Sequence, residues 1–257
     1  FSMSSLLQTT VVRGRFLDIQ NLVTQAADIA EQVRYIEDGV LISEAGKIKW
    51  FGAWQDAAAH LPEGVAIQHY PEKLIVPGFI DTHIHFPQTE MVGAYGEQLL
   101  EWLNTYTFPT EMQFADAAYA AQIAEFFVQE LLKNGTTTAL VFCTVHPESV
   151  DALFEAAQRH HMRLIAGKVM MDRHAPDALC DTPERAYTDS KALIEKWHGQ
   201  GRALYAITPR FAPTSTPEQL QLAGQLKAEY PDVYVHTHLS ENKNEIAWVK
   251  ELFPAQQ

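Results

Sequence analysis

Basic side chains, cysteines and long apolar runs are all scarce in this sequence. Lys and Arg number 19 against 32 Asp and Glu, and the formal net charge is −13. An acidic chain repels phosphate backbones and anionic membrane surfaces, so nucleic-acid and membrane binding are disfavoured as its main task. No apolar run is long enough to cross a bilayer. A neutral small molecule remains possible as the substrate.

The two cysteines, Cys143 and Cys180, lie far apart and match no disulfide or metal-ligand spacing. Reduced cysteines are typical of the cytosol, so we expect a cytoplasmic protein. A Gly-rich loop and a Pro-Cys-x-x-Cys motif are also missing. Their absence counts against a Rossmann-type nucleotide site and against one class of zinc deaminase.

The first 73 residues have the pattern of a small β-domain. Residues 9–19 are rich in Val, Thr and Phe and predict a strand. Residues 35–54 predict two strands that are joined at Glu44-Ala45-Gly46, a Gly-containing hairpin turn. We therefore predict that residues 1–73 form the N-terminal part of a β-sandwich.

From residue 74 to residue 257, apolar strands alternate with helices. The predicted strands are residues 74–85, 136–145, 163–172, 203–211 and 232–241. The predicted helices between them are residues 116–133, with Asp116 as its cap, and residues 147–161, 182–198 and 216–230. Apolar strands with helical crossovers indicate an α/β fold with a parallel sheet, either a (β/α)₈ TIM-type barrel or a doubly wound sheet.

The length of the chain bears on this choice. A complete barrel has about 250 residues and eight strands, whereas about five βα units are present here. We favour a barrel of which this chain is the N-terminal portion, and we expect the natural protein to continue beyond Gln257.

Two histidines end the first predicted strand of this region. His83 and His85 are two residues apart, so on a strand both side chains project from one face. The carboxyl ends of strands are where barrel enzymes place their chemistry, and neutral imidazole suits zinc, iron and similar divalent ions. A His-x-His pair alone is equally consistent with two unrelated loop histidines. The preceding apolar strand favours the metal site.

A second histidine cluster ends the fifth predicted strand. His238 and Glu241 are three residues apart, a spacing that suits a metal ligand beside a general acid or base. The structural alternative is a capped turn in which Ser240 or Glu241 supports the next helix. His236 shares a face with His238, and we predict that it is a neighbouring or core histidine and not a ligand.

Arg210 ends the fourth predicted strand. A guanidinium there is suited to grip a carbonyl or an anionic group of a substrate, and a surface ion pair is an equally good interpretation. Lys168 lies inside the third predicted strand and receives no predicted role.

The sequence PGFIDTHIH at residues 77–85 resembles the amidohydrolase superfamily, whose first barrel strand carries a His-x-His metal pair. Residues 83–111 are similar to the guanine deaminase family, as are the stretches NGTTTALVFCTVHPES, AGKVMMDR, ITPRFAPTS and HTHLSENKNEI. The similarity covers nearly all of residues 8–253. It implies hydrolysis of guanine to xanthine and ammonia by a metal-activated water, and often a homodimer.

The resemblance also implies roles for single residues. His83, His85 and His238 match the metal ligands, and Glu241 matches the acid that shuttles protons. Gln88 matches the residue that holds the guanine ring through its amide.

Arg210 and Phe211 match a pair that contacts the base, with Arg210 facing the purine carbonyl, and His238 also borders the substrate. The family's usual metal is zinc, and iron suits the same ligands. Because the fourth strand carries no lysine at the position of binuclear relatives, the resemblance implies one metal ion.

Two other readings stay open. An amidohydrolase that acts on cytosine, an adenine derivative or a triazine would share the strand chemistry, since only Gln88, Arg210 and residues 86–111 point to guanine. The resemblance also implies a later histidine and a later aspartate that these 257 residues do not contain. An inactive fragment or a non-catalytic relative is therefore the other alternative.

Overall fold

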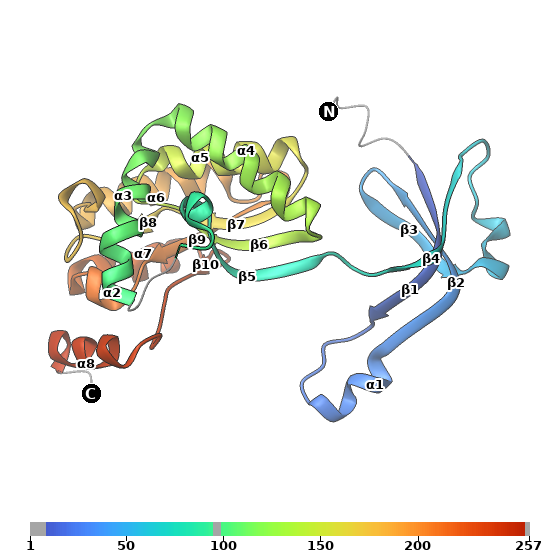
Figure 1. Cartoon of the computed structure of the whole chain (residues 1–257), viewed down its shortest axis with the longest axis horizontal. Helices are drawn as coiled ribbons and strands as arrows, with labels where there is room; N and C mark the ends of the chain where they lie inside the picture. Colours follow the sequence, from blue (N-terminus) through green and yellow to red (C-terminus); the bar gives the residue numbers. More distant parts are fainter. Residues whose placement is uncertain (1–8, 95–98, 255–257) are drawn as a thin grey trace. The chain divides into compact units, whose positions relative to one another are not determined.

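The computed structural model describes residues 9–94 and 99–254 of the chain. Contacts divide the chain into two compact units, Phe1–Gly78 and Phe79–Gln257 (Figure 1). Among the described residues, no helix combines the length and the apolar character that a membrane crossing requires.

The first unit is a four-stranded sheet. Its strands are β1 (Thr10–Ile19), β2 (Val33–Glu44), β3 (Lys47–Ala53) and β4 (Ile67–Ile75), in the order β3-β2-β1-β4. Strand β1 pairs antiparallel with β2 and parallel with β4. The predicted hairpin turn is confirmed, because Ala45 and Gly46 between β2 and β3 have φ angles of 52° and 73°. Two positive φ angles in a row fit a type I′ turn.

Short helical segments complete this unit, namely η2 (Ala26–Asp28), α1 (Ile29–Gln32) and η3 (Trp54–Ala59). Its small core consists of Val11, Val40, Ile42 and Ala57, with two tryptophans packed against them.

The predicted strand at residues 74–85 is in fact two strands. Residues 74 and 75 end β4 and pair with β1 of the small sheet, whereas β5 (Phe79–His85) belongs to the second unit. Pro77 lies between them, and proline has no N–H to donate to a sheet. The apolar run therefore breaks at that point, and the prediction of one continuous strand was wrong.

The second unit is built on a parallel sheet. Its strands are β5, β6 (Thr136–Phe142), β7 (Arg163–Gly167), β8 (Val169–Met170), β9 (Ala203–Pro209) and β10 (Tyr234–Val235). The order is β5-β6-β7-β9-β10, with β8 paired to β9, and every pairing is parallel. Neighbouring strands follow chain order without reversal. This is the progression of a barrel, whereas a doubly wound sheet reverses its order part-way.

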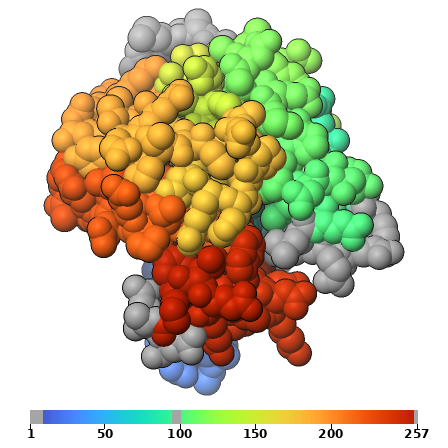
Figure 2. Space-filling view, turned by 90° about the vertical axis from the view of Figure 1, so that its left-hand side faces the viewer, coloured from blue at the N-terminus to red at the C-terminus, as the bar shows by residue number. Residues whose placement is uncertain are grey.

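Helices connect these strands in turn. They are α4 (Ala117–Lys133), α5 (Pro147–Arg159), α6 (Pro183–Trp197) and α7 (Pro217–Glu229), and α8 (Lys243–Leu252) follows β10. Helices α4 to α7 lie over one face of the sheet (Figure 1) and succeed one another across the surface in chain order (Figure 2). The main core lies between these helices and the strands, with Phe154, Leu164 and Ile207 among its fully buried members.

Local capping explains where the helices begin. The Asp116 carboxylate accepts hydrogen bonds from the N–H groups of Ala118 and Tyr119 at 2.8 and 3.2 Å, as predicted for the cap of α4. Thr182 and Thr216 cap α6 and α7 in the same way, each followed by proline at the first helical position.

The third predicted strand, residues 163–172, is interrupted at Lys168. A Cβ added to Gly167 would lie 1.7 Å from the carbonyl oxygen of Ala206, so the two backbones approach closely there. Beyond this contact, β8 continues along β9.

The fifth predicted strand, residues 232–241, is shorter in the structure and covers only Tyr234–Val235. Beyond it, the N–H groups of His236 and His238 still donate to the carbonyl oxygens of Ile207 and Arg210 at 2.8 and 3.0 Å. The histidine segment therefore stays fixed beside β9 without being a regular strand.

The connection from β5 to α4 differs from the others in its length. It contains η4 (Phe86–Met91), α2 (Leu99–Trp102), η5 (Leu103–Thr107), α3 (Phe108–Met112) and η6 (Gln113–Ala115). Phe86, Leu103, Phe108 and Phe114 anchor it in the interior. The connection follows directly on the carboxyl end of β5, where His83 and His85 lie.

Candidate metal centre and substrate pocket

His83 and His85 end β5 on one face of the strand. Their ring centroids are 5.3 Å apart. The His83 backbone N–H donates to the Asp81 carboxylate at 3.0 Å, which holds the strand end in place. Strand geometry alone thus aims both imidazoles in one direction, as the His-x-His spacing predicts.

His238 approaches them from the segment after β10. Its ring Nδ1 lies 2.8 Å from the Arg210 carbonyl oxygen. Because a carbonyl only accepts hydrogen bonds, Nδ1 carries the proton and Nε2 presents a lone pair. That Nε2 lies 3.0 Å from Nε2 of His85.

The three imidazoles form a compact donor set. One ligand nitrogen from each of His83, His85 and His238 lies within 4.8 Å of the other two. Ligands at about 2.0–2.1 Å from a tetrahedral zinc lie roughly 3.4 Å from one another. The observed spacing therefore fits a single divalent ion. Nδ1 of His85 is buried without a hydrogen-bond partner among the described residues, so no polar group fixes that side of its ring.

Burial favours the neutral form of His85 and His238. Desolvation, followed by the charge of Arg210 and of the neighbouring histidines, holds the pKa of His85 well below its usual value. Desolvation lowers the pKa of His238 to about 4, although its bond to the Arg210 carbonyl acts in the opposite direction. Metal binding requires neutral imidazole, so both groups are in the ligating form at neutral pH.

Phe142, at the end of β6, packs its ring against the histidine rings. It pairs with His85 in the sheet register, and the two rings stack at 4.7 Å with an interplanar angle of 8°. The ring centroids of His238 and His236 lie 4.2 and 3.7 Å from the centroid of the same phenyl ring. Sequence reasoning missed this residue, because a phenylalanine in an apolar strand gives no functional signal.

His236 lies beside the set of three and not within it. It is 5% exposed, and neither ring nitrogen has a hydrogen-bond partner among the described residues. Burial lowers its pKa to about 3, with smaller contributions from His83 and His238. Its position agrees with the predicted role of a neighbouring histidine.

A cavity of about 170 Å³ opens onto the imidazoles. It is lined by the three histidines and by Gln88, Trp102, Leu103, Arg210, Phe211 and Glu241. The structure therefore gathers every residue that the sequence singled out for metal, substrate or proton chemistry. Trp102 and Leu103 come from the long connection after β5.

Glu241 reaches this cavity from the start of α8. Its backbone N–H donates to the Glu245 carboxylate at 2.8 Å, within the capping box that Asn242 and Glu245 form. Glu245 is thus the helix-capping acid. The Glu241 side chain, which is exposed and lines the cavity, is left available for chemistry.

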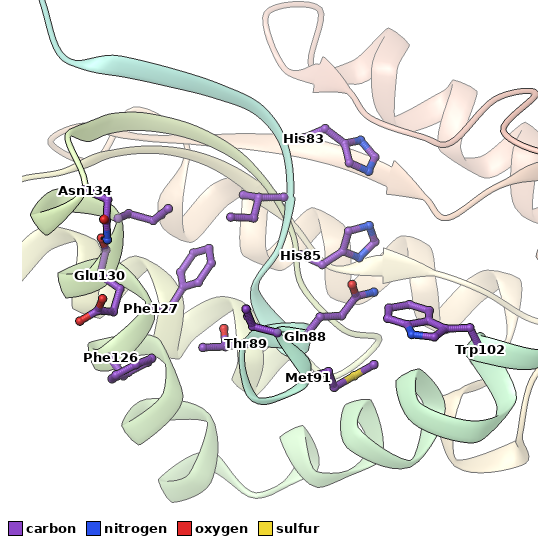
Figure 3. Close-up of a pocket in the computed structure, with 13 residues that line it drawn as sticks. His83, His85, Gln88, Thr89, Met91, Trp102, Phe126, Phe127, Glu130 and Asn134 are labelled. Carbon is purple, nitrogen blue, oxygen red and sulfur yellow. The ribbon is translucent and has the colours of Figure 1, made fainter. Parts of the chain in front are cut away.

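Gln88 and Phe211 form two further walls of the cavity. Gln88 lies on η4, and its side chain extends between His85 and Trp102 (Figure 3). Phe211 is 6% exposed and packs edge-on against Trp248 of α8 at 6.4 Å. An amide beside aromatic faces suits a flat ring that carries polar edges.

Arg210 is neither a free cation nor a surface ion pair. Its side chain is buried, and its two Nη atoms donate to the Glu111 carboxylate at 2.7 and 3.0 Å. The Phe108 ring lies 5.6 Å from the guanidinium carbon. Sequence reasoning missed Glu111, because the acid precedes its partner by 99 positions and only the fold joins them.

The match to a known family agrees with this arrangement. Residues 74–256 match the profile of the amidohydrolase family. The chain belongs to this family. Amidohydrolases are metal-dependent enzymes, which accords with the three imidazoles found here.

Several relatives of this amidohydrolase are guanine deaminases. The guanine deaminase of Escherichia coli K12 is 62% identical over 95% of this chain and 55% of its own length. A solved E. coli guanine deaminase has a TM-score of 0.93 at 61% identity, over 95% of this chain and 57% of that one. The predicted resemblance and the barrel-type fold are both confirmed. The chain spans about half the length of the curated relatives it matches.

A third relative adds a ligand. The guanine deaminase from C. acetobutylicum, solved "with bound guanine in the active site", has a TM-score of 0.83 at 30% identity. The match covers 96% of this chain and 57% of that one.

A larger groove of about 660 Å³ adjoins the cavity of this amidohydrolase. It runs from His83 and His85 past Gln88 and Trp102 to α4, where Phe126, Phe127 and Glu130 line it (Figure 3). Its far end at α4 carries no histidine or arginine among the described residues that line it. The imidazoles, Arg210 and Glu241 converge on the smaller cavity.

Lys168, to which the sequence assigned no role, forms the second buried ion pair of the unit. Its side chain is fully buried, and its ammonium contacts the Asp181 carboxylate. Burial lowers the pKa of Lys168, while the charge of Asp181 raises it. Neither residue lines the cavity. This pair lies in the core, whereas the Arg210–Glu111 pair borders the candidate site.

Proposed function

We propose that the natural full-length protein hydrolyses guanine to xanthine and ammonia. The observation that carries this proposal is the convergence of three imidazoles, Arg210 and Glu241 on one small cavity. The identity of 62% to the E. coli guanine deaminase supports it, as does the C. acetobutylicum relative solved with guanine.

His83, His85 and His238 are proposed to hold one divalent metal ion, with zinc as the preferred ion because imidazole nitrogens at this spacing suit it. When bound, such an ion lowers the pKa of a water molecule to about 7 and so supplies the nucleophile at neutral pH. The Arg210 carbonyl contributes by fixing the His238 ring in the tautomer that leaves Nε2 free to bind the ion.

Glu241 is proposed to move the protons. Its carboxylate would accept a proton from the attacking water and deliver it to a ring nitrogen of the base. The same group would then take the proton of the new C2 hydroxyl and pass it to the amine, which leaves from C2 as ammonia while the C2 carbonyl forms. This role needs a carboxylate that is accessible from the cavity, and the Glu241 side chain meets that condition.

Gln88, Arg210 and Phe211 are proposed to orient the ring. The Gln88 amide can donate to and accept from the polar edge of a purine, and Phe211 offers an apolar face. Arg210, which only donates, suits the ring carbonyl. His238 borders the same space, so it would touch both metal and substrate.

The test is an assay of the natural full-length protein with a panel of ring substrates. Guanine should be consumed, as followed by ultraviolet absorbance, and stripping the metal with a chelator should abolish turnover until zinc is restored. Activity with only cytosine, adenine derivatives or triazines would overturn the proposal, as would a protein that binds no metal.

Glu241→Gln isolates the proton step. We expect turnover to fall by about 10²–10⁴-fold, because a general base is lost while the ring-binding groups remain. Metal content, measured by elemental analysis, should stay unchanged. Glu130→Gln on α4 is the matched control and should leave turnover intact. Near-normal turnover of Glu241→Gln would remove this residue from the mechanism.

A cytoplasmic location, a homodimeric state and the absence of nucleic-acid or membrane partners stay predictions from the sequence. Sedimentation of the full-length protein would test the dimer.

A further inference from the structure

We propose that Glu111 is a specificity-determining positioning residue: its carboxylate holds the Arg210 guanidinium so that the cavity accepts a ring carbonyl and rejects an analogue without one. This inference deepens the proposed function and rests on it. The two side chains lie on segments 99 residues apart and meet in a bidentate pair at 2.7 and 3.0 Å.

The pair is fully desolvated, since Arg210 is 3% and Glu111 1% exposed. Removing two charges from water costs more than their attraction commonly returns, so a buried pair is weak evidence for a stabilising role. Hydrophobic side chains of similar volume would fill the same space without that cost. Because this pair lies at the wall of the cavity, we assign it a role in substrate recognition.

Geometry gives Glu111 control over the guanidinium. Bidentate pairing fixes the plane of the group as well as its position, because two parallel bonds remove its freedom to rotate. The Phe108 ring, at 5.6 Å on the same helix as Glu111, borders the guanidinium as well. Helix α3, which belongs to the long β5–α4 connection, thus holds the Arg210 guanidinium in place.

Arg210 lines the cavity together with His83, His85 and Gln88. A guanidinium has more N–H groups than Glu111 engages, and it has no acceptor. A fixed array of donors binds a carbonyl oxygen well and leaves buried donors unpaired when the oxygen is missing. Sites of this kind discriminate strongly, because unpaired buried groups are costly.

Glu111 also balances charge beside the metal centre. Arg210 adds positive potential at His85 and His238, and its carbonyl oxygen accepts a hydrogen bond from His238. A neutralising carboxylate at 2.7 Å offsets that potential. Without it, a bare cation would lie next to groups that are proposed to bind a cation.

The test compares guanine with 2-aminopurine, which has the same exocyclic amine but no ring carbonyl. The measured quantities are kcat and KM for guanine and the inhibition constant of 2-aminopurine, all in the natural full-length protein. In Glu111→Gln, which keeps the shape but loses the charge and one acceptor oxygen, we expect kcat/KM for guanine to fall about 100-fold. Affinity for 2-aminopurine should change less than about twofold, and Glu111→Asp should lie between the two proteins.

Two further variants separate positioning from damage to the fold. Asp181→Asn breaks the other buried pair, with Lys168, and should lower the melting temperature while the preference for guanine persists. Arg210→Met with Glu111→Leu replaces the pair by apolar groups and should fold yet lose the preference. This double variant keeps the test meaningful if Glu111→Gln folds poorly.

Equal losses for guanine and 2-aminopurine in Glu111→Gln, or no loss for either, would overturn the positioning role. Retained preference in the double variant would overturn it as well. If the unaltered protein does not consume guanine at all, the proposed function fails, and that outcome is visible before any variant is made.

Discussion

The inner and outer strands of the parallel sheet differ in burial and in what they contribute. Strands β7 and β9 are mostly buried and β6 is buried toward its carboxyl end, whereas β5 and β10 are mostly exposed in the 257-residue chain. Ile80 of β5 is 67% exposed and Val235 of β10 is 52% exposed, while Ile207 of β9 is fully buried. Within the described residues, each outer strand has one sheet neighbour.

This difference divides the candidate site into two sets of groups. His83, His85 and His238, which are proposed to bind metal, lie on or just beyond the outer strands. The inner strands supply what holds them, namely the Phe142 ring beneath the imidazoles and the Arg210 carbonyl that fixes His238. The proposed metal ligands therefore lie in the less buried part of the sheet in the 257-residue chain, and the well-packed part contacts and orients their rings.

The largest effect is expected from Phe142 on the inner strand β6. Phe142→Ala should lower the free energy of unfolding by about 3–5 kcal/mol, because it leaves a cavity below four imidazole rings. It should also weaken zinc binding by about tenfold through loss of ring orientation. Urea unfolding of the metal-free chain and zinc titration calorimetry would measure the two effects.

Phe142→Leu is the matched control, since it keeps most of the volume and should cost less than about 1.5 kcal/mol. Unchanged zinc affinity in Phe142→Ala would show that the outer strands orient the imidazoles without help from β6.

A smaller effect per pH unit is expected from acidification of the metal-free chain. The pKa of His238 is lowered to about 4 and that of His236 to about 3, chiefly by burial. Their unfolded pKa is about 6.5, so between these values the unfolded state binds more protons than the folded state. Stability should therefore be highest above pH 6.5 and fall as the pH drops toward 4, by about 1.4 kcal/mol per pH unit for each imidazole.

Urea unfolding at a series of pH values, with chelator present, would measure that slope. His236→Leu should reduce the slope of unfolding free energy against pH by the contribution of one imidazole. A stability that does not change between pH 7 and pH 5 would mean that these imidazoles are solvated and that the packing against Phe142 does not persist in solution.

The smallest effect is expected on the outer strand. In the 257-residue chain, Ile80→Thr should change the free energy of unfolding by no more than about 0.5 kcal/mol, since the side chain is largely in water. Ile207→Thr is the inner-strand counterpart and should cost about 1–3 kcal/mol, because it buries a hydroxyl. Equal costs by urea unfolding would abolish the distinction between inner and outer strands.

Much of the fold could be predicted from local pattern. Asp116 before an amphipathic run and Gly46 in the hairpin turn mark boundaries that the structure reproduces, because caps and turns depend on neighbouring residues. The break at Lys168 could not be predicted, since it arises where Gly167 meets the backbone of β9. Nothing in the sequence around Gly167 indicates which strand will lie against it.

The candidate site likewise contains residues that could be predicted from the sequence and residues that could not. His83 with His85, and His238 with Glu241, could be predicted because the carboxyl ends of parallel strands meet at one edge of a sheet. Phe142 and Glu111 could not, since neither carries a motif. Each acts through a partner that is distant in sequence, His85 for the phenyl ring and Arg210 for the carboxylate.

The sequence by itself determined the alternation of strands and helices and the residue types at the strand ends, because periodicity, capping and side-chain chemistry are local properties. Only the tertiary structure decided that three imidazoles lie within 4.8 Å of one another and that Arg210 is paired with Glu111. It also decided which apolar strands are covered. These features depend on which distant segments pack together, and that packing is a property of the whole fold.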